Sequence, residues 1–546
     1  AKLILAGTTR KILDWIDVKS AYGINPDDVL CVDAITTYDG KITSEPDWES
    51  VVEKNREWFS NAKALCVAEV FAPRNGAAIE RKAKEVITRH FKVPFVMANE
   101  LTGGANVMER GATALLNARL LPVIEEFTKA VEVALKARNL DIETMIVRSD
   151  GSLMTMEMSK SRPVETILSG PAASIVGGRA LGRSDNSIIV DMGGTTTDIS
   201  VLEDDIPVMV DSIRIGKWRT QIKGVFIDTF GLGGDSRIFK SVNLISISSR
   251  RVVPLCIAAV KWPQIIDSLE NLESLKKMHT FPLYEFLYLV RVPDMTEDYT
   301  SHEKVIIETL KNGPVMLGDC VFDIYNLKTE RLEDEGIVMR CGLTPTDIMH
   351  IKGDFNVFDT RASILGAKCF LNSIDRYIDS DNPVMEFCDE VYEIVSKKLY
   401  SRIVRILMER QFLDSTDFKY TDNVEFIIGQ SWNKRNLPAG RQMLGLNFET
   451  KAKLVGIGAP THIFLAEVAK ALGTGCVLPE HAEVANAVGA VVADIRSESV
   501  IEIKQETGVD EKTVYVLHSD QIYEYYASYE DAVERARSLT EKFALD

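Results

Sequence analysis

The segment Ser187–Glu203, which reads SIIVDMGGTTTDISVLE, constrains the fold of this chain more than any other stretch. Two short apolar runs, Ile188–Val190 and Ile199–Leu202, flank a polar stretch that contains two glycines and three threonines. Such β-branched runs favour strands, so the polar residues between them are predicted to form a tight turn. The segment therefore predicts a β-hairpin with a glycine-rich tip.

The tip of this hairpin has the composition of a phosphate-binding turn. Gly193 and Gly194 allow backbone conformations and a close ligand approach that a Cβ would prevent, and successive N–H groups at such a turn can bind an anion. Thr195, Thr196 and Thr197 add hydroxyl donors. The chain has no GxxxxGK[ST] motif, and no GxGxxG opens a helix here. A hairpin whose glycines only satisfy turn geometry is the alternative.

Two aspartates frame the turn. Asp191 ends the first strand, where a carboxylate could hold a hydrated Mg²⁺ that bridges two phosphates of a nucleotide. Asp198 begins the second strand and is predicted either to fix the turn or to position the attacking water. The candidate catalytic residues are therefore Asp191, Thr195 and Asp198, with Asp191 as the metal ligand and Gly193, Gly194 and Thr196 as nucleotide-binding residues.

A second glycine cluster, Gly231–Ser236, follows a predicted strand. The backbone amides of Gly233 and Gly234 could line a phosphate or substrate pocket, and a plain loop is an equal alternative. Asp235 adds a negative charge that would repel a phosphate unless a metal intervenes. Arg237 is the nearby residue that could neutralise this charge.

A third glycine turn, Gly456–Pro460, separates a predicted strand from a predicted helix at Thr461–Leu472. This arrangement lets an adenine or a ribose approach the backbone and the helix N-terminus. By its position alone, the turn could equally be the capped start of a helix. The candidate nucleotide-binding residues in it are Gly456, Gly458, Ala459 and Pro460.

These motifs resemble the hydantoinase A and 5-oxoprolinase family, within the superfamily of actin, sugar kinases and heat-shock ATPases. The resemblance rests on VRSDGSLM, RPVETILSGPAAS and VDMGGTTTD, which lie within Val147–Glu203, and on GLTPTD at Gly342–Asp347. It extends to Met108–Pro122 and to Val455–Asp494, so the matching blocks follow the family order over most of the chain.

The resemblance implies an α/β protein with a two-lobed, actin-like and ribonuclease H-like ATPase fold. The Asp191 turn would be the second phosphate loop of that fold, and Gly456–Pro460 would be its adenosine motif. Helices near Gly111–Leu121 and Val484–Asp494 would connect the two lobes. ATP and Mg²⁺ are the cofactors that this fold implies.

The function that the resemblance implies is that of an ATP-dependent hydantoinase- or oxoprolinase-type hydrolase subunit. Phosphoryl transfer to the oxygen of a cyclic amide, or of a ketone or enolate, would activate that small molecule for hydrolysis or carboxylation. A hydantoinase B-type subunit would complete the chemistry, and an oligomer is expected. The sequence does not identify the ring or the ketone.

The chain departs from the family pattern at its N-terminus. Family members carry a related DxGGTxTD hairpin, the first phosphate loop, roughly 70 residues before the strand that resembles Leu3–Ala6. Gly7-Thr8-Thr9 does not replace it, because no acidic residue precedes these three. Unless that hairpin comes from elsewhere, we expect no ATP hydrolysis by these 546 residues. A truncated or a split protein would both fit, and a non-catalytic ATP-binding or assembly subunit is the alternative function.

Changes of pattern along the chain predict five segments. Apolar runs and helical spans alternate in residues 1–110, which predicts an α/β domain with a parallel sheet that lacks the first phosphate hairpin. Residues 111–250 are predicted to contain a connecting helix and the phosphate-2 hairpin lobe. The remaining segments are an inserted, mostly helical module at 251–345, the nucleotide lobe with the adenosine motif and the second connecting helix at 346–500, and a small C-terminal unit at 501–546.

Residues 301–341 read as helix, turn, helix and strand, which resembles a winged helix. This segment is acidic and the chain has a formal net charge of −17, so nucleic acid is not an expected partner. A compact structural insertion is therefore favoured over an ATPase-fold regulator with a winged-helix insert.

Cysteine usage and hydropathy indicate the compartment. The eight cysteines form no CxxC pair and are expected to be reduced core thiols. No stretch approaches 18 consecutive apolar residues, so no membrane association is expected and the cytoplasm is predicted.

Overall fold

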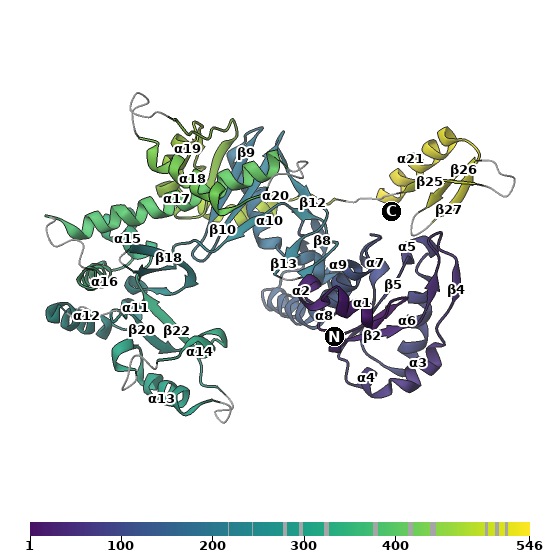
Figure 1. Ribbon diagram of the computed structural model, residues 1–546, viewed down its shortest axis with the longest axis horizontal. Coiled ribbons are helices and arrows are strands. Elements are labelled where there is room, and N and C mark those ends of the chain that lie inside the picture. The colour runs from purple at the N-terminus through teal and green to yellow at the C-terminus, as the bar shows by residue number, and fades with distance from the viewer. Residues whose placement is uncertain are drawn as a thin grey trace. The chain divides into compact units, whose positions relative to one another are not determined.

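The computed structural model describes residues 1–216, 218–242, 244–276, 281–293, 299–320, 327–374, 381–412, 419–436, 444–496, 501–507, 513–518 and 522–545. The chain separates into two compact units (Figure 1). Unit 1 consists of Ala1–Val176, Val208–Phe226 and Gly489–Asp546, and unit 2 consists of Gly177–Pro207 and Ile227–Val488. Both units mix helices with strands, as the sequence predicts.

A four-stranded parallel sheet with the order β2–β1–β5–β6 forms the centre of unit 1. Its strands are β1 (Lys2–Ala6), β2 (Val29–Val32), β5 (Leu65–Glu69) and β6 (Phe95–Met97). Parallel sheets are covered on both faces, which explains the almost continuous apolar runs of β1 and β5. The parallel sheet predicted for the first 110 residues is therefore confirmed.

Alternate residues of β1 enter two different cores. Leu3 and Leu5 pack with residues of α8 (Val107–Ala137) on one face of the sheet. Ile4 and Ala6 pack on the other face with a second set of buried residues, which includes Trp48. This division follows from the two-residue period of a strand, whose successive side chains point to opposite faces.

The remaining elements of unit 1 connect these strands or extend the unit. They are α1 (Arg10–Trp15), α2 (Val18–Tyr22), η1 (Pro26–Asp28), β3 (Ile35–Thr36), β4 (Ile42–Ser44), α3 (Trp48–Lys54), α4 (Arg56–Ser60), α5 (Ala72–Asn75), α6 (Ala78–His90), α7 (Ala98–Leu101), β7 (Met145–Val147), β8 (Leu153–Thr155), α9 (Met156–Ser161), η2 (Pro163–Thr166), β12 (Met209–Val210), β13 (Arg214–Ile215), β14 (Trp218–Arg219), β15 (Gly224–Val225), β25 (Glu502–Thr507), β26 (Thr513–His518), β27 (Tyr523–Tyr526) and α21 (Tyr529–Leu545). Two helices, α10 (Ser169–Gly182) and α20 (Ala485–Val492), contain residues of both units.

A sheet with the order β11–β10–β9–β23–β24 organises unit 2, and β16 also pairs with β10. The strands are β9 (Ser187–Met192), β10 (Thr197–Glu203), β11 (Ile206–Pro207), β16 (Asp228–Phe230), β23 (Lys453–Ile457) and β24 (Cys476–Val477). β9 pairs antiparallel with β10 and parallel with β23. The predicted turn at Gly193-Gly194 joins β9 to β10, and the predicted turn at Gly456–Pro460 is at the end of β23, so β9 is next to both.

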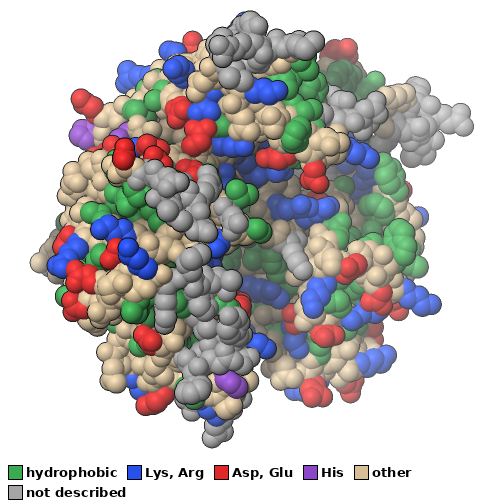
Figure 2. All heavy atoms as spheres, turned by 60° about the vertical axis from the view of Figure 1, so that its left-hand side comes forward, with side chains coloured by type: hydrophobic (Ala, Val, Ile, Leu, Met, Phe, Trp, Pro, Cys, Tyr) green, Lys and Arg blue, Asp and Glu red, His purple; other side chains and the backbone are tan. Residues whose placement is uncertain are grey.

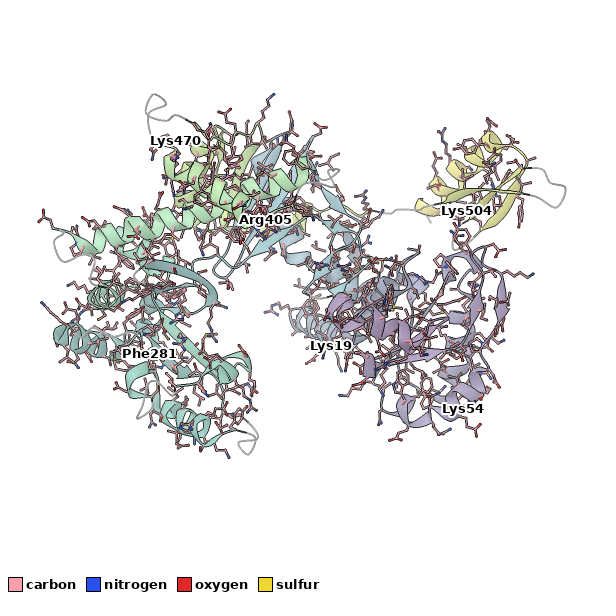
Figure 3. All side chains as sticks on the ribbon, in the orientation of Figure 1. Lys19, Lys54, Phe281, Arg405, Lys470 and Lys504 are labelled. Carbon is pink, nitrogen blue, oxygen red and sulfur yellow. The ribbon has the colours of Figure 1, made fainter. Side chains whose placement is uncertain are left out.

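Helices pack together beside this sheet. The long helix α17 (Pro383–Gln411) contacts α15 (Pro345–Lys352), α16 (Arg361–Asn372), α18 (Asp422–Lys434) and α19 (Thr461–Ala471). In Figure 3, Arg405 marks α17 and Lys470 marks the C-terminal end of α19. Further elements are β17 (Ser236–Ser241), β18 (Leu244–Arg251), α11 (Leu255–Lys261), α12 (Gln264–Leu275) and η8 (Ala482–Val484).

A second sheet of unit 2, with the order β19–β22–β20–β21, occupies the inserted segment. Its strands are β19 (Val253–Pro254), β20 (Phe286–Leu289), β21 (Val315–Met316) and β22 (Val338–Gly342), and its helices are α13 (Ser301–Thr309), η4 (Leu310–Asn312), η5 (Leu317–Asp319) and α14 (Glu330–Asp334). With α11 and α12, which also lie in it, the described part of this segment contains more helical than strand residues, so the predicted mostly helical module is confirmed. The winged-helix form stays a prediction, because residues 321–326 lie outside the described residues.

The surface and the cysteines fit the composition. On the face that Figure 2 displays, acidic and basic side chains are interspersed. All eight cysteines are free, and six of them are buried, as expected for core thiols. Burial raises the pKa of the Cys320 thiol to about 12, so this thiol stays protonated at neutral pH.

Among the helices that the structure describes, none is both long and apolar enough to cross a membrane.

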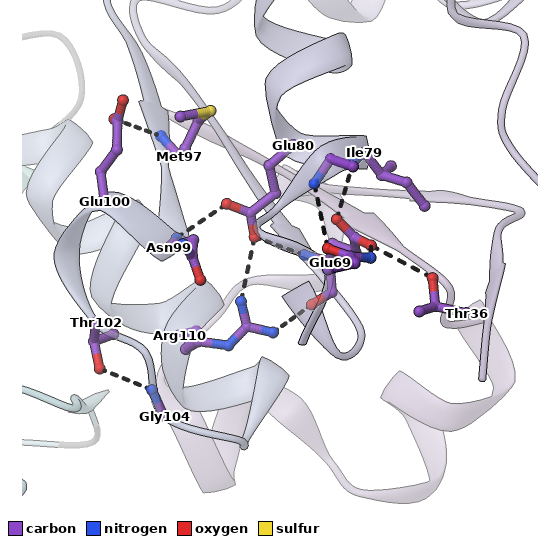
Figure 4. Close-up of polar contacts among 12 residues, drawn as sticks. Thr36, Glu69, Ile79, Glu80, Met97, Asn99, Glu100, Thr102, Gly104 and Arg110 are labelled. Atoms are coloured by element: carbon purple, nitrogen blue, oxygen red, sulfur yellow. Dashed lines mark hydrogen bonds and ion pairs between the residues drawn. The ribbon is translucent and has the colours of Figure 1, made fainter. Parts of the chain in front are cut away.

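A buried ionic cluster joins the carboxyl end of β5 to α6 and α8 (Figure 4). The Glu80 carboxylate lies 3.2 Å from the Arg110 guanidinium, and both side chains are fully buried. Glu80 also accepts hydrogen bonds from the backbone N–H groups of Glu69 and Asn99, each at 3.0 Å. The Glu69 carboxylate accepts one from the N–H of Ile79 at 3.1 Å. Arg110 thus bonds the Glu80 carboxylate and also the backbone carbonyl of Glu69.

This cluster predicts a pH-dependent stability of unit 1. Burial raises the pKa of Glu80 from 4.5 to about 7, although the Arg110 charge opposes the shift. The pKa of Glu80 is higher in the folded state than in the unfolded state. The contribution of Glu80 to the free energy of unfolding is therefore complete below pH 4.5 and is lost as the pH rises through about 7. Hydrogen exchange of β5 should therefore show less protection at pH 8 than at pH 5, after correction for the intrinsic exchange rate. Glu80→Gln should flatten this dependence, and an unchanged slope in that variant would contradict the assignment.

Candidate functional site

The predicted hairpin with its glycine tip is present. Asp191 and Asp198 lie opposite each other in the register of β9 and β10, and the N–H of Gly193 donates to the carbonyl of Thr196 at 3.0 Å to close the turn. Gly193 and Gly194 are exposed and neither has a positive φ. A left-handed backbone is therefore not the reason for these glycines. A Cβ on Gly194 would lie 3.0 Å from Oδ2 of Asp235, whereas a Cβ on Gly193 would make only an ordinary contact with the Thr196 carbonyl at 3.5 Å.

The second glycine cluster packs directly onto this turn. The N–H groups of Gly234 and Asp235 donate to the carbonyls of Gly193 and Gly194 at 3.1 and 2.6 Å. A Cβ on Gly233 would lie 2.5 Å from the backbone of Gly194, so only glycine fits there. The structure thus brings the first two predicted glycine pairs together.

The amides of this cluster are used within the protein. The N–H of Gly233 donates to the Ser236 hydroxyl at 2.9 Å, and that of Gly234 donates to the turn. The prediction that these amides line a phosphate pocket is therefore corrected, because they brace the turn by close packing instead. The Thr197 hydroxyl adds to the bracing with a hydrogen bond to the carbonyl of Leu232 at 2.7 Å.

The third glycine turn, Gly456–Pro460, lies beside Asp191 because β23 runs parallel to β9. Ile457 lies opposite Asp191 in the register, and Gly458 follows with a φ of +84°. A Cβ on Gly458 would lie 2.4 Å from the carbonyl oxygen of Met192 and 3.0 Å from Oδ1 of Asp191. Glycine is thus required at 458, both for the backbone conformation and for the close approach to Asp191.

The other residues predicted in this turn lie around the start of α19. The Thr461 hydroxyl donates to the carbonyl of Gly458 at 2.8 Å, and Nδ1 of His462 lies 2.7 Å from the carbonyl of Ala459. Pro460 precedes the first turn of the helix. A Cβ on Gly456 would lie 2.8 Å from the Leu478 side chain, so this glycine allows close packing of the strand.

Negative charge gathers at the turn end of the hairpin. Burial raises the pKa of Asp198, a hydrogen bond from Thr229 lowers it, and the charges of Asp191 and Asp228 raise it further. Two carboxylates directly across a strand pair repel each other, so a cation at this point would stabilise the hairpin. Asp228 has its own cation, because Arg402 of α17 forms a paired salt bridge with it.

The donor set fits a metal ion that arrives with a nucleotide. Mg²⁺ in nucleotide sites is held by one or two carboxylates, by waters and by the phosphates themselves. Within the described part of the chain, no group of three or more His, Cys, Asp or Glu side chains could hold a metal. Asp191, with Asp198 opposite, therefore fits Mg²⁺ bound jointly with phosphates and does not fit a metal held by protein ligands alone.

The charge of Asp235 is neutralised by a residue that the sequence analysis did not select. Arg237 pairs with the buried Glu285 instead, at 2.6 and 3.0 Å. Nε of Arg251 lies 3.2 Å from Oδ2 of Asp235. The prediction that Arg237 neutralises Asp235 is therefore wrong, because Glu285 lies fully buried and needs cationic partners of its own.

The block Gly342–Asp347 has a role that the sequence analysis left unassigned. Asp347 is fully buried and accepts hydrogen bonds from Cys256 N–H at 2.9 Å and from the Ser363 hydroxyl at 2.6 Å. Thr344 and Asp347 form a capping box at the start of α15, a spacing that could have been recognised in the sequence. Thr346 bonds the carbonyl of Gly234 through both its N–H and its hydroxyl, so this block supports the glycine cluster.

Parts of the chain are similar to known proteins. Residues 110–254 match the model of the hydantoinase/oxoprolinase family. The chain is 25% identical to caprolactamase subunit alpha from Pseudomonas jessenii over 194 residues, which are 34% of this chain and 28% of that protein. It is 28% identical to 5-oxoprolinase 1 from Arabidopsis thaliana over 170 residues, 30% of this chain and 13% of that protein. The matched stretches thus span less than a third of either relative.

Two solved structures have a similar fold. The nucleotide-free structure of acetone carboxylase matches with a TM-score of 0.56 at 13% identity, over 93% of this chain and 60% of that chain. The ATP-dependent caprolactamase from Pseudomonas jessenii matches with a TM-score of 0.59 at 16% identity, over 100% of this chain and 64% of that chain.

Proposed function

We propose that this chain, which belongs to the hydantoinase/oxoprolinase family, is the ATP-dependent subunit of an enzyme that activates the oxygen of a cyclic amide for hydrolysis. The observation that carries the proposal is the convergence of three glycine turns on Asp191 within one unit. Glycines at these turns would let a phosphate approach the backbone, and the opposed carboxylates would attract its cation.

Each residue of the site has a proposed role. Asp191 would hold Mg²⁺, and Gly194, Thr195 and Thr196 would donate hydrogen bonds to the terminal phosphates. Gly193, whose N–H closes the turn, would let the phosphates approach the backbone. Asp198 would keep the turn in place through Thr229, or orient a water. When bound, ATP would supply the phosphoryl group that makes the amide carbonyl easier to attack.

The adenosine end would lie at the third turn. Gly458 is fixed against Asp191, and the N-terminus of α19 follows directly, so the backbone there can approach a ribose or an adenine. We propose that Gly456, Gly458, Ala459 and Pro460 form this part of the site. The two-lobed actin-like arrangement belongs to the same proposal.

The substrate and the partner are proposed from the relatives. Caprolactamase and 5-oxoprolinase are named for cyclic amides, and the caprolactamase relative is named as a subunit alpha, which supports a second, B-type subunit here. A ketone substrate is the second candidate, supported by the similar fold of acetone carboxylase.

The test is ADP release from Mg-ATP in the presence of 5-oxoproline, hydantoin, caprolactam or acetone, with and without a hydantoinase B-type subunit. We expect one cyclic amide to stimulate ADP release when both subunits are present. Stimulation by acetone alone would favour the ketone alternative. ATP binding without stimulation by any substrate would favour a non-catalytic ATP-binding or assembly subunit.

A further inference from the structure

A carboxylate stands beside the exposed glycine turn. Oδ2 of Asp235 lies 3.0 Å from the position that a Cβ on Gly194 would occupy, so the carboxylate fills the space next to this glycine. The backbone fixes it there, because the N–H of Asp235 donates to the carbonyl of Gly194 at 2.6 Å and its carbonyl accepts from Val252 at 3.0 Å. An anion bound at the turn would be repelled by this negative charge.

Arg251 pairs with the Asp235 carboxylate through one of its guanidinium nitrogens, Nε. Ser236 and Arg251 lie opposite each other in the register of β17 and β18, which brings the Arg251 side chain to Asp235. Nε of Arg251 donates to the Asp235 carboxylate at 3.2 Å. Among the described residues, this is the one hydrogen bond that the Arg251 guanidinium makes. The side chain remains 57% exposed, whereas that of Asp235 is 16% exposed. The two terminal nitrogens are therefore available to a ligand.

Nearby arginines are engaged elsewhere. Arg237 pairs with Glu285, and Arg250 lies 3.2 Å from Glu333. Both acceptors are buried carboxylates, so moving either arginine to the glycine turn would leave a buried charge without that partner. Arg251 can share its partner instead of leaving it, because it bonds Asp235 through Nε and its own side chain is 57% exposed.

We propose that Arg251, oriented by Asp235, is the side chain that neutralises the terminal phosphate of the nucleotide at the Gly193-Gly194 turn. This inference rests on the proposed function. An arginine held through Nε presents its two terminal nitrogens as a fork that matches two phosphate oxygens. The pair also removes the repulsion that Asp235 alone would exert on a phosphate. Arg251 is thus a binding residue, and Asp235 is its positioning residue.

The test compares ATP with AMP, because AMP lacks the phosphates that would reach the turn. Arg251→Ala should weaken ATP binding by roughly 10- to 100-fold, the range for a lost hydrogen bond between charged groups, and should leave AMP binding unchanged. The double variant Asp235→Ser with Arg251→Ala should recover part of the ATP affinity, because it also removes the uncompensated carboxylate. Isothermal titration calorimetry of the whole chain measures the dissociation constants of ATP and AMP for each variant.

Arg250→Ala is the matched control, since it removes the neighbouring arginine of the same strand and should not change the ATP affinity. Equal ATP affinities of the unaltered chain and Arg251→Ala would overturn the inference. A parallel loss of ATP and AMP binding would also overturn it, because it would indicate a general structural role. If the unaltered chain binds AMP and ATP equally well, the terminal phosphates do not reach the turn, and the proposed function fails with the inference.

Discussion

Asparagine in place of Asp191 is expected to weaken Mg-ATP binding by roughly 10²- to 10³-fold. The amide keeps the size of the carboxylate but loses the charge that would hold the cation. Asp198 cannot substitute for it, because its carboxylate already accepts a hydrogen bond from Thr229 and burial raises its pKa. Calorimetric titration with ATP, with and without Mg²⁺, measures the effect.

The matched control is Asp204→Asn, which changes an exposed carboxylate just beyond the other end of β10. This variant should bind Mg-ATP like the unaltered chain, since Asp204 lies outside all three glycine turns. The dependence on Mg²⁺ separates the metal role of Asp191 from a structural one. If Asp191→Asn still binds ATP more tightly with Mg²⁺ than without it, Asp191 is not the metal ligand.

Local patterns were enough to predict the framework of this site. The β-branched runs around Asp191 predict two strands, and the glycines between them predict the turn, because both signals lie within a few residues. The same holds for the strand, turn and helix around Gly458. These elements form where expected because their apolar residues also fit the sheet that buries them.

The supports of the site could not be predicted in this way. Which cation serves Asp235 depends on the register between β17 and β18, and this register brings Arg251 to it while Arg237 reaches Glu285. The bond between Thr346 and the Gly234 carbonyl joins positions 112 residues apart. Periodicity and motif spacing contain no information about such contacts, because they arise only when distant strands and helices pack.

Methionine in place of Arg110 should have the largest effect on stability, a loss of about 3–5 kcal/mol from the free energy of unfolding of unit 1. Arg110 is fully buried on α8 and bonds Glu80 at 3.2 Å (Figure 4). Methionine fills much of the same volume, so the loss would come mainly from the Glu80 carboxylate, which stays buried without its cation. Hydrogen exchange of β5 and α6 measures the change within unit 1.

A companion variant separates charge from packing. Arg110→Met combined with Glu80→Gln should be more stable than Arg110→Met alone, because the second change removes the carboxylate that the first leaves without its cation. Arg119→Met is the control on the same helix: Arg119 pairs with Asp28 at 3.1 Å with both side chains partly exposed, so less than about 1 kcal/mol should be lost. If the two single variants lose equal stability, or if Glu80→Gln gives no recovery, the buried ionic cluster does not hold β5, α6 and α8 together. Recovery would show that the charge of Glu80, and not the volume of Arg110, determines the residue required at this position of α8.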